Sequence, residues 1–574
     1  MLEKLVCLLF NILPFLFIGQ VGPGGVLDNT NNVFWVKADA GVYNDAGLTL
    51  ATNTQNIRQW NDNSGNSKHF VEAMSTQQPI FISNLINGFP AVRFDGNNDR
   101  LSNLTISSGN TANFFTVIRY SSLPNPNPGI FQGSPSGSLL SSGANDKAVG
   151  MWISNANKPW GRGIQSNNAV KNIPAAISTS ANTNYIIENE YNGTAINQYV
   201  NSTISGSIAY DQTLRSWTEF SIGRQGTETW AGDIAEVISF NTNINLAQRN
   251  IINNYLSAKY NISIAASVDF YSGDNSVKGD YDFEVGGIGQ SSAGNTNNSF
   301  YPSVSGGMGI SYVSGFQDGD YILAGHNLKT GNMMQAIDCG GMTGTQNERW
   351  SRIWFVDATD VAPKITSNVV FDMSDGGIIG LPSSNASDFV LLYRSGTSGN
   401  WSESSIVPAI SGDNVTFLGV LLSDGYYTLG IKNVNVIVLP IELVSFEAIK
   451  LKNEVLVSWK TASEINNDYF EVERSFDGQH FTRIARLEGA GNSTHTINYT
   501  FKDKDFVKGV NYYKLIQTDY NGNETMSDIV AVDMNQNSET KIKTVNLYGQ
   551  EVNEHFSGIV YDVYSDGSLV KRIQ

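Results

Sequence analysis

Cysteine is almost absent from this 574-residue sequence, which contains only Cys7 and Cys339. Cys7 lies in an apolar N-terminal segment that we expect to be removed, so the mature chain would hold one thiol and no internal disulfide. Cys339 sits in a glycine-rich stretch, DCGGM, with no histidine or second cysteine near it in the sequence. We therefore predict a buried structural thiol and not a nucleophile.

Charged residues are also scarce, at 16% of the chain against about 25% in an average globular protein. Acidic residues outnumber basic ones by 53 to 36, which gives a net charge of −17. Such a surface repels the phosphate backbone of nucleic acids and the anionic headgroups of lipids. We therefore expect no nucleic-acid partner, whereas a cation such as calcium is compatible with this charge.

Long apolar runs are missing apart from one at the N-terminus. Lys4 precedes an apolar run from Leu5 to Ile18, which Gly19 and Gln20 end. The run is typical of a signal-peptide core, and we assign residues 1–20 to a signal peptide. An uncleaved membrane anchor remains the alternative. No other segment approaches the roughly 18 apolar residues that span a bilayer, so we expect no transmembrane segment after signal removal.

Catalytic motifs are absent as well. The sequence has no Gly-x-Ser-x-Gly motif and no Walker-type loop, and its five histidines lack metal-ligand spacing. A retaining glycoside hydrolase needs two carboxylates about 5–5.5 Å apart. The nearest candidates, Asp233 and Glu236 in GDIAEVI, are three residues apart, so strand alternation predicts that they point to opposite faces. We predict that the protein is not an enzyme.

Short strand-forming segments dominate the chain beyond residue 30. Runs such as NVFWVKA, FFTVIRY and IAEVISF are separated by clusters of glycine, asparagine, aspartate and serine. Many short strands with regular turns are typical of sandwiches, so we predict an all-β, multi-domain fold. One segment, LAQRNIINNYLSAKY at 246–260, instead predicts a short amphipathic helix that closes a domain.

Four stretches between residues 21 and 262 resemble the laminin-G-like, concanavalin A-like jelly-roll family. They are FWVKADAGV at 34–42, WNDNSGN at 60–66, NGFPAVRFDGNNDRL at 87–101, and WAGDIAEVISF with the following helix at 230–262. The resemblance implies two packed antiparallel sheets whose first and last strands lie side by side.

The rest of the chain resembles further modules of secreted surface proteins from the phylum Bacteroidetes. Residues 263–437 are similar to a β-rich domain of unknown function that follows laminin-G-like domains, through YDFEVGGIG, DGDYILAGHN and ERWSRIWFVDATD. Residues 438–535 resemble a fibronectin type III or immunoglobulin-like module, in which Trp459 of VSWKT matches the buried core aromatic. Residues 536–574, with NLYGQEV and YDVYSDG, resemble the C-terminal sorting domain of the type IX secretion system.

Calcium is one candidate ligand, because hard cations prefer carboxylate and carbonyl oxygens. Asp39, Asp95 and Asp233 lie in the stretches that resemble the jelly-roll family, and Asp99 follows Asp95 in the same loop. Asp39 and Asp233 would lie on neighbouring strands of such a fold. The alternative is that these residues only stabilise turns.

A glycan is the other candidate ligand, because an aromatic ring can cover the apolar face of a sugar while polar side chains bind its hydroxyls. Trp160 in NKPWGRG lies between proline and glycine, which predicts a loop, and it is our best candidate for an exposed aromatic. Trp35 lies in an apolar strand and is expected in a core.

These observations predict a secreted or cell-surface protein that binds an extracellular glycan or protein ligand and is exported by the type IX secretion machinery. The alternative is a secreted polysaccharide-degrading enzyme or its accessory carbohydrate-binding subunit. Only the jelly-roll fold motivates this alternative, and fold alone does not give function.

Overall fold

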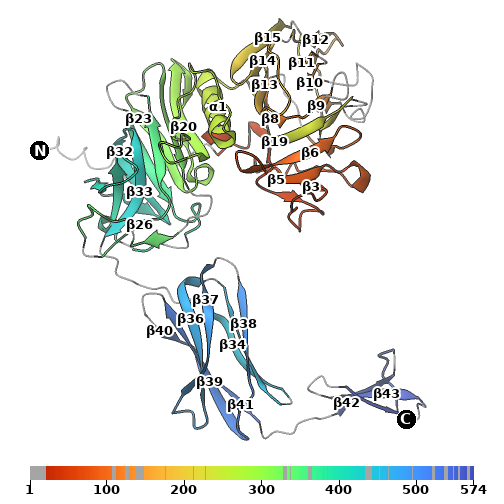
Figure 1. The fold of residues 1–574 in the computed structure, drawn as a ribbon, viewed down its shortest axis with the longest axis vertical. Coiled ribbons are helices and arrows are strands. Elements are labelled where there is room, and N and C mark those ends of the chain that lie inside the picture. Colours follow the sequence, from red (N-terminus) through yellow and green to blue (C-terminus); the bar gives the residue numbers. More distant parts are fainter. Residues whose placement is uncertain are drawn as a thin grey trace, which may run out of the picture. The chain divides into compact units, whose positions relative to one another are not determined.

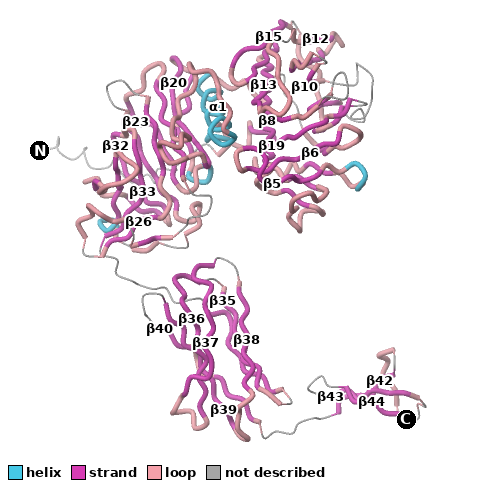
Figure 2. The backbone as a smooth tube through the Cα atoms, in the orientation of Figure 1, coloured by secondary structure: helices cyan, strands magenta, loops and turns pink. Residues whose placement is uncertain are grey.

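The regular secondary structure of the computed structural model consists almost entirely of antiparallel strands (Figures 1 and 2). It describes residues 21–106, 111–122, 128–135, 148–154, 156–174, 176–210, 212–225, 228–327, 333–336, 338–344, 346–359, 365–378, 381–383, 385–432, 443–451, 453–462, 464–493, 496–519, 524–534, 541–546, 548–553, 556, 558–564 and 569–573. The chain divides into two compact units, 1–436 and 437–574. The prediction of an all-β, multi-domain protein is confirmed, whereas the expected signal peptide lies outside the described residues.

The first sheet of the N-terminal sandwich has eight strands. Along the sheet they are β15 (Thr203–Ala209), β14 (Ala195–Val200), β13 (Tyr185–Tyr191), β8 (Ala112–Arg119), β19 (Ala231–Phe240), β6 (Phe89–Asp95) and β5 (Ile80–Ile86), with β1 (Asn32–Lys37) paired to β19. The first strand of the segment thus lies antiparallel to its last, with Trp35 opposite Ile238. This pairing is the one that the jelly-roll resemblance implies.

The second sheet of this sandwich has nine strands. They are β12 (Val170–Asn172), β11 (Pro159–Ile164), β10 (Val149–Ile153), β9 (Gly129–Ser134), β16 (Glu219–Ile222), β7 (Leu101–Asn103), β4 (Phe70–Val71), β3 (Gln59–Trp60) and β2 (Val42–Tyr43), followed by a separate hairpin of β17 (Arg224–Gln225) and β18 (Glu228–Thr229). The inner faces of the two sheets enclose an apolar core around Phe34, Phe114 and Phe220. Burial of these side chains is the main stabilising contribution in such a sandwich.

One α-helix, α1 (Leu246–Tyr260), follows β19 over the residues that the sequence predicts. Asn245 and Gln248 form a capping box at its N-terminus, because each side chain accepts from the other residue's backbone N–H. The prediction of an amphipathic helix is wrong, since every residue of α1 except Leu246 and Arg249 is buried. The helix is buried on so many sides because β-strands lie on both sides of it (Figure 1).

A second sandwich follows α1 within the same unit. Its larger sheet contains β21 (Asn295–Asn297), β20 (Phe283–Ser292), β24 (Asp320–His326), β27 (Trp354–Ala358), β33 (Gly425–Lys432), β26 (Asn347–Trp350), β25 (Met334–Gln335), β29 (Phe389–Arg394) and β30 (Ser402–Glu403). The smaller sheet contains β22 (Ser299–Phe300), β23 (Met308–Ser314), β28 (Thr366–Asp372), β32 (Asn414–Leu421) and β31 (Ala409–Ser411). Cys339 is half-buried here, and burial raises the pKa of its thiol, which disfavours the reactive thiolate.

The two sandwiches of the first unit share a hydrophobic cluster. It joins Trp35 and Ile238 of the first sheet, Ile251 of α1, and Leu323 and Phe355 of the second sandwich. Each sandwich therefore covers apolar surface of the other sandwich that would otherwise face water.

The second unit contains a smaller sandwich and a separate three-stranded sheet. The sandwich consists of β34 (Leu443–Lys450), β35 (Val455–Thr461) and β38 (Ile497–Asp503) against β37 (Thr482–Ser493), β36 (Glu464–Ser475), β39 (Val510–Asp519), β40 (Glu524–Met526) and β41 (Val530–Asp533). The separate sheet consists of β42 (Lys541–Asn546), β43 (Ile559–Tyr564) and β44 (Leu569–Ile573). No helix in the described part of the chain is long and apolar enough to cross a membrane.

Candidate functional site

Trp160 lies in strand β11 and not in the loop that the sequence predicts. The neighbouring glycines suggested a loop, but Gly161 and Gly163 are strand residues that face the core. A Cβ on Gly161 would lie 2.8 Å from Ile173, and one on Gly163 would lie 2.7 Å from Ile196. Trp160 alternates with these glycines and therefore points away from the core. Its side chain remains partly exposed.

Trp160 forms a stacked pair with Trp152, the residue opposite it on β10. The ring centroids are 4.5 Å apart and the ring planes differ by 8°. Trp152 is completely buried, and its Nε1 donates to Glu228 Oε2 at 2.7 Å. The buried ring thus supports the partly exposed one, which gives Trp160 a fixed orientation on the outer face of the second sheet.

Polar residues accompany the tryptophan pair on the same face. The guanidinium carbon of Arg162 lies 5.1 Å and 5.3 Å from the Trp152 and Trp160 centroids. Arg162 Nε donates to Asn172 Oδ1 at 2.8 Å, and Asn172 is exposed. Partial burial lowers the pKa of Arg162, and the nearby Glu228 carboxylate opposes this shift. We call Trp152, Trp160, Arg162 and Asn172 the tryptophan face.

The tryptophan face continues inward as a polar row across neighbouring strands. Cross-strand pairing places Gln132 of β9 opposite Gly150, which in turn lies opposite Arg162. Gln132 is buried, and its Oε1 has no hydrogen-bond partner among the described residues. An unpaired buried acceptor costs free energy. The Gln132 end of the row therefore carries an acceptor that no described residue uses.

Of the four aspartates considered for calcium, only Asp95 and Asp99 are brought together. The Asp95 backbone N–H donates to Asp99 Oδ2 at 2.9 Å. Burial, together with the Asp95 charge, raises the pKa of Asp99 to about 7. Asp95 itself accepts from the Asn97 and Asn98 backbones, so both residues also have the turn-stabilising role that was the alternative.

Asp39 and Asp233 are each paired with a cation. Asp39 Oδ1 lies 2.9 Å from Lys259 Nζ, and Asp233 Oδ1 lies 2.7 Å from Arg93 Nε. Asp39 follows the end of β1 in a turn and does not lie on a strand beside Asp233. In the described ranges no group of three or more histidine, cysteine or acidic side chains is placed to hold a metal ion. Calcium binding therefore stays a prediction.

Asp233 and Glu236 point to the same face of β19, contrary to the expectation from strand alternation. The pairing of β19 with β8 shifts register between Ile234 and Glu236, and such a β-bulge adds one residue to the alternation. Asp233 contacts Arg93, and Glu236 accepts from Trp35 Nε1 at 2.6 Å, both on the side of α1. Nothing in the sequence marks this bulge.

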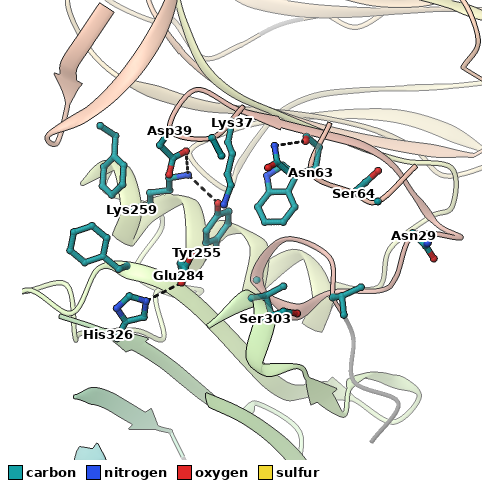
Figure 3. Close-up of a pocket in the computed structure, with 18 residues that line it drawn as sticks. Asn29, Lys37, Asp39, Asn63, Ser64, Tyr255, Lys259, Glu284, Ser303 and His326 are labelled. Atoms are coloured by element: carbon teal, nitrogen blue, oxygen red, sulfur yellow. Dashed lines mark hydrogen bonds and ion pairs between the residues drawn. The ribbon is translucent and has the colours of Figure 1, made fainter. Parts of the chain in front are cut away.

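A cavity of about 610 Å³ lies within the first unit, between β1, α1 and the start of the second sandwich (Figure 3). Lys37, Asp39 and Asn63 line one side, and Glu284 and His326 line the other. Trp35, Phe89, Tyr255 and Phe283 supply apolar walls. Sequence reasoning missed this site because its residues lie in seven segments of the chain, between residues 21 and 326, and it assigned Trp35 only to a core.

Comparisons with known proteins give distant similarities. No protein-family model matches the sequence, and no curated protein matches it. Among solved structures, the chain is similar to domain 4 of AbnA, a GH43 extracellular arabinanase from Geobacillus stearothermophilus, in complex with arabinotriose. The identity is 10%, over 39% of this chain and 97% of that domain, with a TM-score of 0.27.

Two other similar structures are a receptor-binding domain and a glycosidase. The botulinum neurotoxin type G receptor binding domain is 10% identical over 75% of this chain and 85% of that domain, with a TM-score of 0.26. Trypanosoma rangeli sialidase in complex with the inhibitor DANA is 13% identical over 39% of this chain but only 32% of its own, with a TM-score of 0.26. At these values the similarities carry no inference about the function of this chain.

Proposed function

We propose that this protein binds carbohydrate outside the cell through the tryptophan face and that it is not an enzyme. The observation that carries the proposal is the partly exposed Trp160 ring, which is stacked on buried Trp152 and has Arg162 and Asn172 beside it. A fixed aromatic ring can cover the apolar face of a sugar, and the adjacent guanidinium and amide can bind its hydroxyls. Because this arrangement lies on a sheet and not in a mobile loop, little ordering is required on binding.

The state of the two carboxylates on β19, Asp233 and Glu236, favours binding over hydrolysis. Although Asp233 and Glu236 share a face, Asp233 is engaged by Arg93, and Glu236 accepts hydrogen bonds from Trp35, Tyr255 and Tyr260. A general acid or nucleophile has to reach a substrate, and Glu236 is 1% exposed.

An array of immobilised plant, algal and animal glycans tests the proposal. We expect the purified protein to bind a subset of them and Trp160→Ala to lose that binding. A matched control is Tyr43→Ala, because Tyr43 is a partly exposed aromatic at the far end of the same sheet. Equal binding by all three proteins would refute the role of the tryptophan face. Release of reducing sugar would show that the protein is an enzyme.

We further propose that the protein reaches the cell surface by type IX secretion, which the resemblance of residues 536–574 supports. Their strands β42, β43 and β44 form a sheet separate from the preceding sandwich, so they can be deleted without opening its core. Removal of the residues from about 537 onward is expected to leave a folded protein in the periplasm. Normal amounts of the truncated protein on the cell surface would overturn this proposal.

A further inference from the structure

We infer that the cavity between β1, α1 and the second sandwich is a second ligand site, which binds a neutral sugar residue at the end of a saccharide chain. It lies against the first sheet of the jelly roll, whereas the tryptophan face belongs to the second sheet. The two sites share no residue, so this inference stands whether or not the tryptophan face binds carbohydrate.

The charges in the cavity favour a neutral ligand. Lys259 pairs with Asp39, and His326 Nε2 lies 3.0 Å from Glu284 Oε2. Lys37 forms an ion pair with none of the acidic side chains that the structure describes, but its charge helps to lower the pKa of both Asp39 and Glu284 against the effect of burial. An anion would meet these two carboxylates, and a cation would meet Lys37.

Hydroxyl groups match this alternation of charges. An ammonium can only donate hydrogen bonds and a carboxylate can only accept them, whereas a hydroxyl does both. A sugar residue that spans the cavity could therefore accept from Lys37 and donate to Glu284 at the same time. Figure 3 shows these groups on opposite sides of the same space.

The walls and the size of the cavity also suit a sugar. Phe283 and Phe89 form an edge-to-face aromatic pair with centroids 5.7 Å apart, and Trp35 lies beneath Lys37, whose Nζ is 4.7 Å from the Trp35 centroid. A volume of about 610 Å³ falls within the range of about 300–1,000 Å³ for small-molecule sites. The lining comes from β1, α1 and the second sandwich, so a ligand would be covered on several sides, which favours a chain end.

The backbone at Glu284 provides an independent sign of a functional site. Glu284 has φ of +50°, a left-handed conformation that non-glycine residues other than asparagine and aspartate rarely adopt. It lies within β20, where the pairing with β24 shifts register between Phe283 and Gly286. Strain of this kind concentrates at functional sites, and here it accompanies a carboxylate that lines the cavity and is 44% exposed.

Buried hydrogen bonds hold the opposite wall in place. Glu236 accepts from Tyr255 and Tyr260 hydroxyls at 2.8 Å each and from Lys259 Nζ at 2.9 Å. Because Lys259 also pairs with Asp39, the network fixes the carboxylate that faces the ligand. Such preorganisation lowers the entropic cost of binding.

The test uses the full chain carrying Trp160→Ala, which removes the central ring of the other site. Titration calorimetry and saturation-transfer NMR would follow a panel of free neutral monosaccharides and disaccharides, with uronic acids and glucosamine as charged probes. We expect at least one neutral sugar to bind. Lys37→Met, which keeps the aliphatic stem over Trp35, and Glu284→Gln should each weaken its binding about tenfold or more.

Lys68→Met is the matched control, because Lys68 lies outside the cavity and donates to the Thr105 carbonyl. It should leave sugar affinity unchanged. Thermal melting of each variant would show that loss of binding is not loss of folding. The inference is overturned if no neutral sugar binds, if only a charged probe binds, or if Lys37→Met and Glu284→Gln bind as tightly as the control.

Discussion

Two carboxylates in one turn, Asp95 and Asp99, make a testable contribution to stability. Burial and the Asp95 charge raise the pKa of Asp99 from 3.8 to about 7. A raised folded-state pKa means that the native state holds the proton more tightly than the unfolded chain does. The resulting stabilisation is fully present below about pH 4 and is lost as the pH rises through 7.

Asp99→Asn should therefore flatten this part of the pH dependence, because the amide stays neutral throughout. We expect the melting temperature of the variant to match that of the wild type near pH 4 and to exceed it at pH 8. If calcium binds Asp95 and Asp99, it should raise the wild-type melting temperature at pH 8 and leave Asp99→Asn unaffected. A constant difference in melting temperature between the two proteins from pH 4 to 8, without calcium, would show that folding does not raise the pKa of Asp99.

At the residue scale, sequence reasoning succeeded where local alternation decides the outcome. In VLVSWKT, strand alternation places Val455, Val457 and Trp459 on one face, and all three are buried in the structure. Sequence reasoning did not foresee that Asp39 pairs with Lys259, because that contact joins residues 220 positions apart. The partner of a charge depends on tertiary packing, which a single sequence does not reveal.

At the scale of elements, the helix 246–260 was predictable in its bounds but not in its surroundings. Its capping box of Asn245 and Gln248 acts locally. Its burial depends on the strands of the second sandwich, which follow it in the chain. The bulge in β19 was likewise invisible, since strict alternation is the only rule that a strand sequence offers.

Strand β35 carries the clearest prediction at this scale, because Trp459 is 1% exposed in the core of its sandwich. The indole stacks on Tyr499 with centroids 5.3 Å apart and meets Phe470 edge to face at 5.5 Å. Truncation of a buried tryptophan to alanine typically costs about 3–5 kcal/mol, a large part of the roughly 5–15 kcal/mol that stabilises a domain.

Trp459→Ala should therefore lower or abolish the calorimetric transition of the second unit and leave that of the first unit in place. Trp459→Phe is the graded control, because it keeps most of the apolar volume and removes an indole N–H that has no hydrogen-bond partner among the described residues. An unchanged second-unit transition in Trp459→Ala would contradict the buried register of β35.

At the scale of the whole molecule, the hydrophobic cluster joins two segments that the sequence assigns to separate domains. The domain boundaries expected from the sequence lie near residues 262 and 437. The hydrophobic cluster, however, contains Trp35 and Ile251 before the first boundary and Phe355 after it. The compact units divide only between 436 and 437. Apolar surface shared between two sandwiches cannot be inferred from composition, because each sequence segment contains enough strand-forming runs to predict a complete sandwich by itself.

Both candidate ligand sites lie in the first unit, against different sheets of its N-terminal sandwich. A polysaccharide with a free end could contact the tryptophan face along its length and the cavity at its terminus. Two sites of modest affinity in one molecule raise the overall affinity for such a polymer when the geometry permits simultaneous contact.

The most direct measurement is the dissociation constant of the best saccharide from the glycan array, determined by titration calorimetry for the wild type, Trp160→Ala and Tyr43→Ala. Loss of a central aromatic contact typically costs about 2 kcal/mol, or roughly thirtyfold in affinity. We predict a loss of that size in Trp160→Ala, with an unchanged melting temperature, and no loss in Tyr43→Ala. Wild-type affinity in a folded Trp160→Ala protein would contradict carbohydrate binding at the tryptophan face.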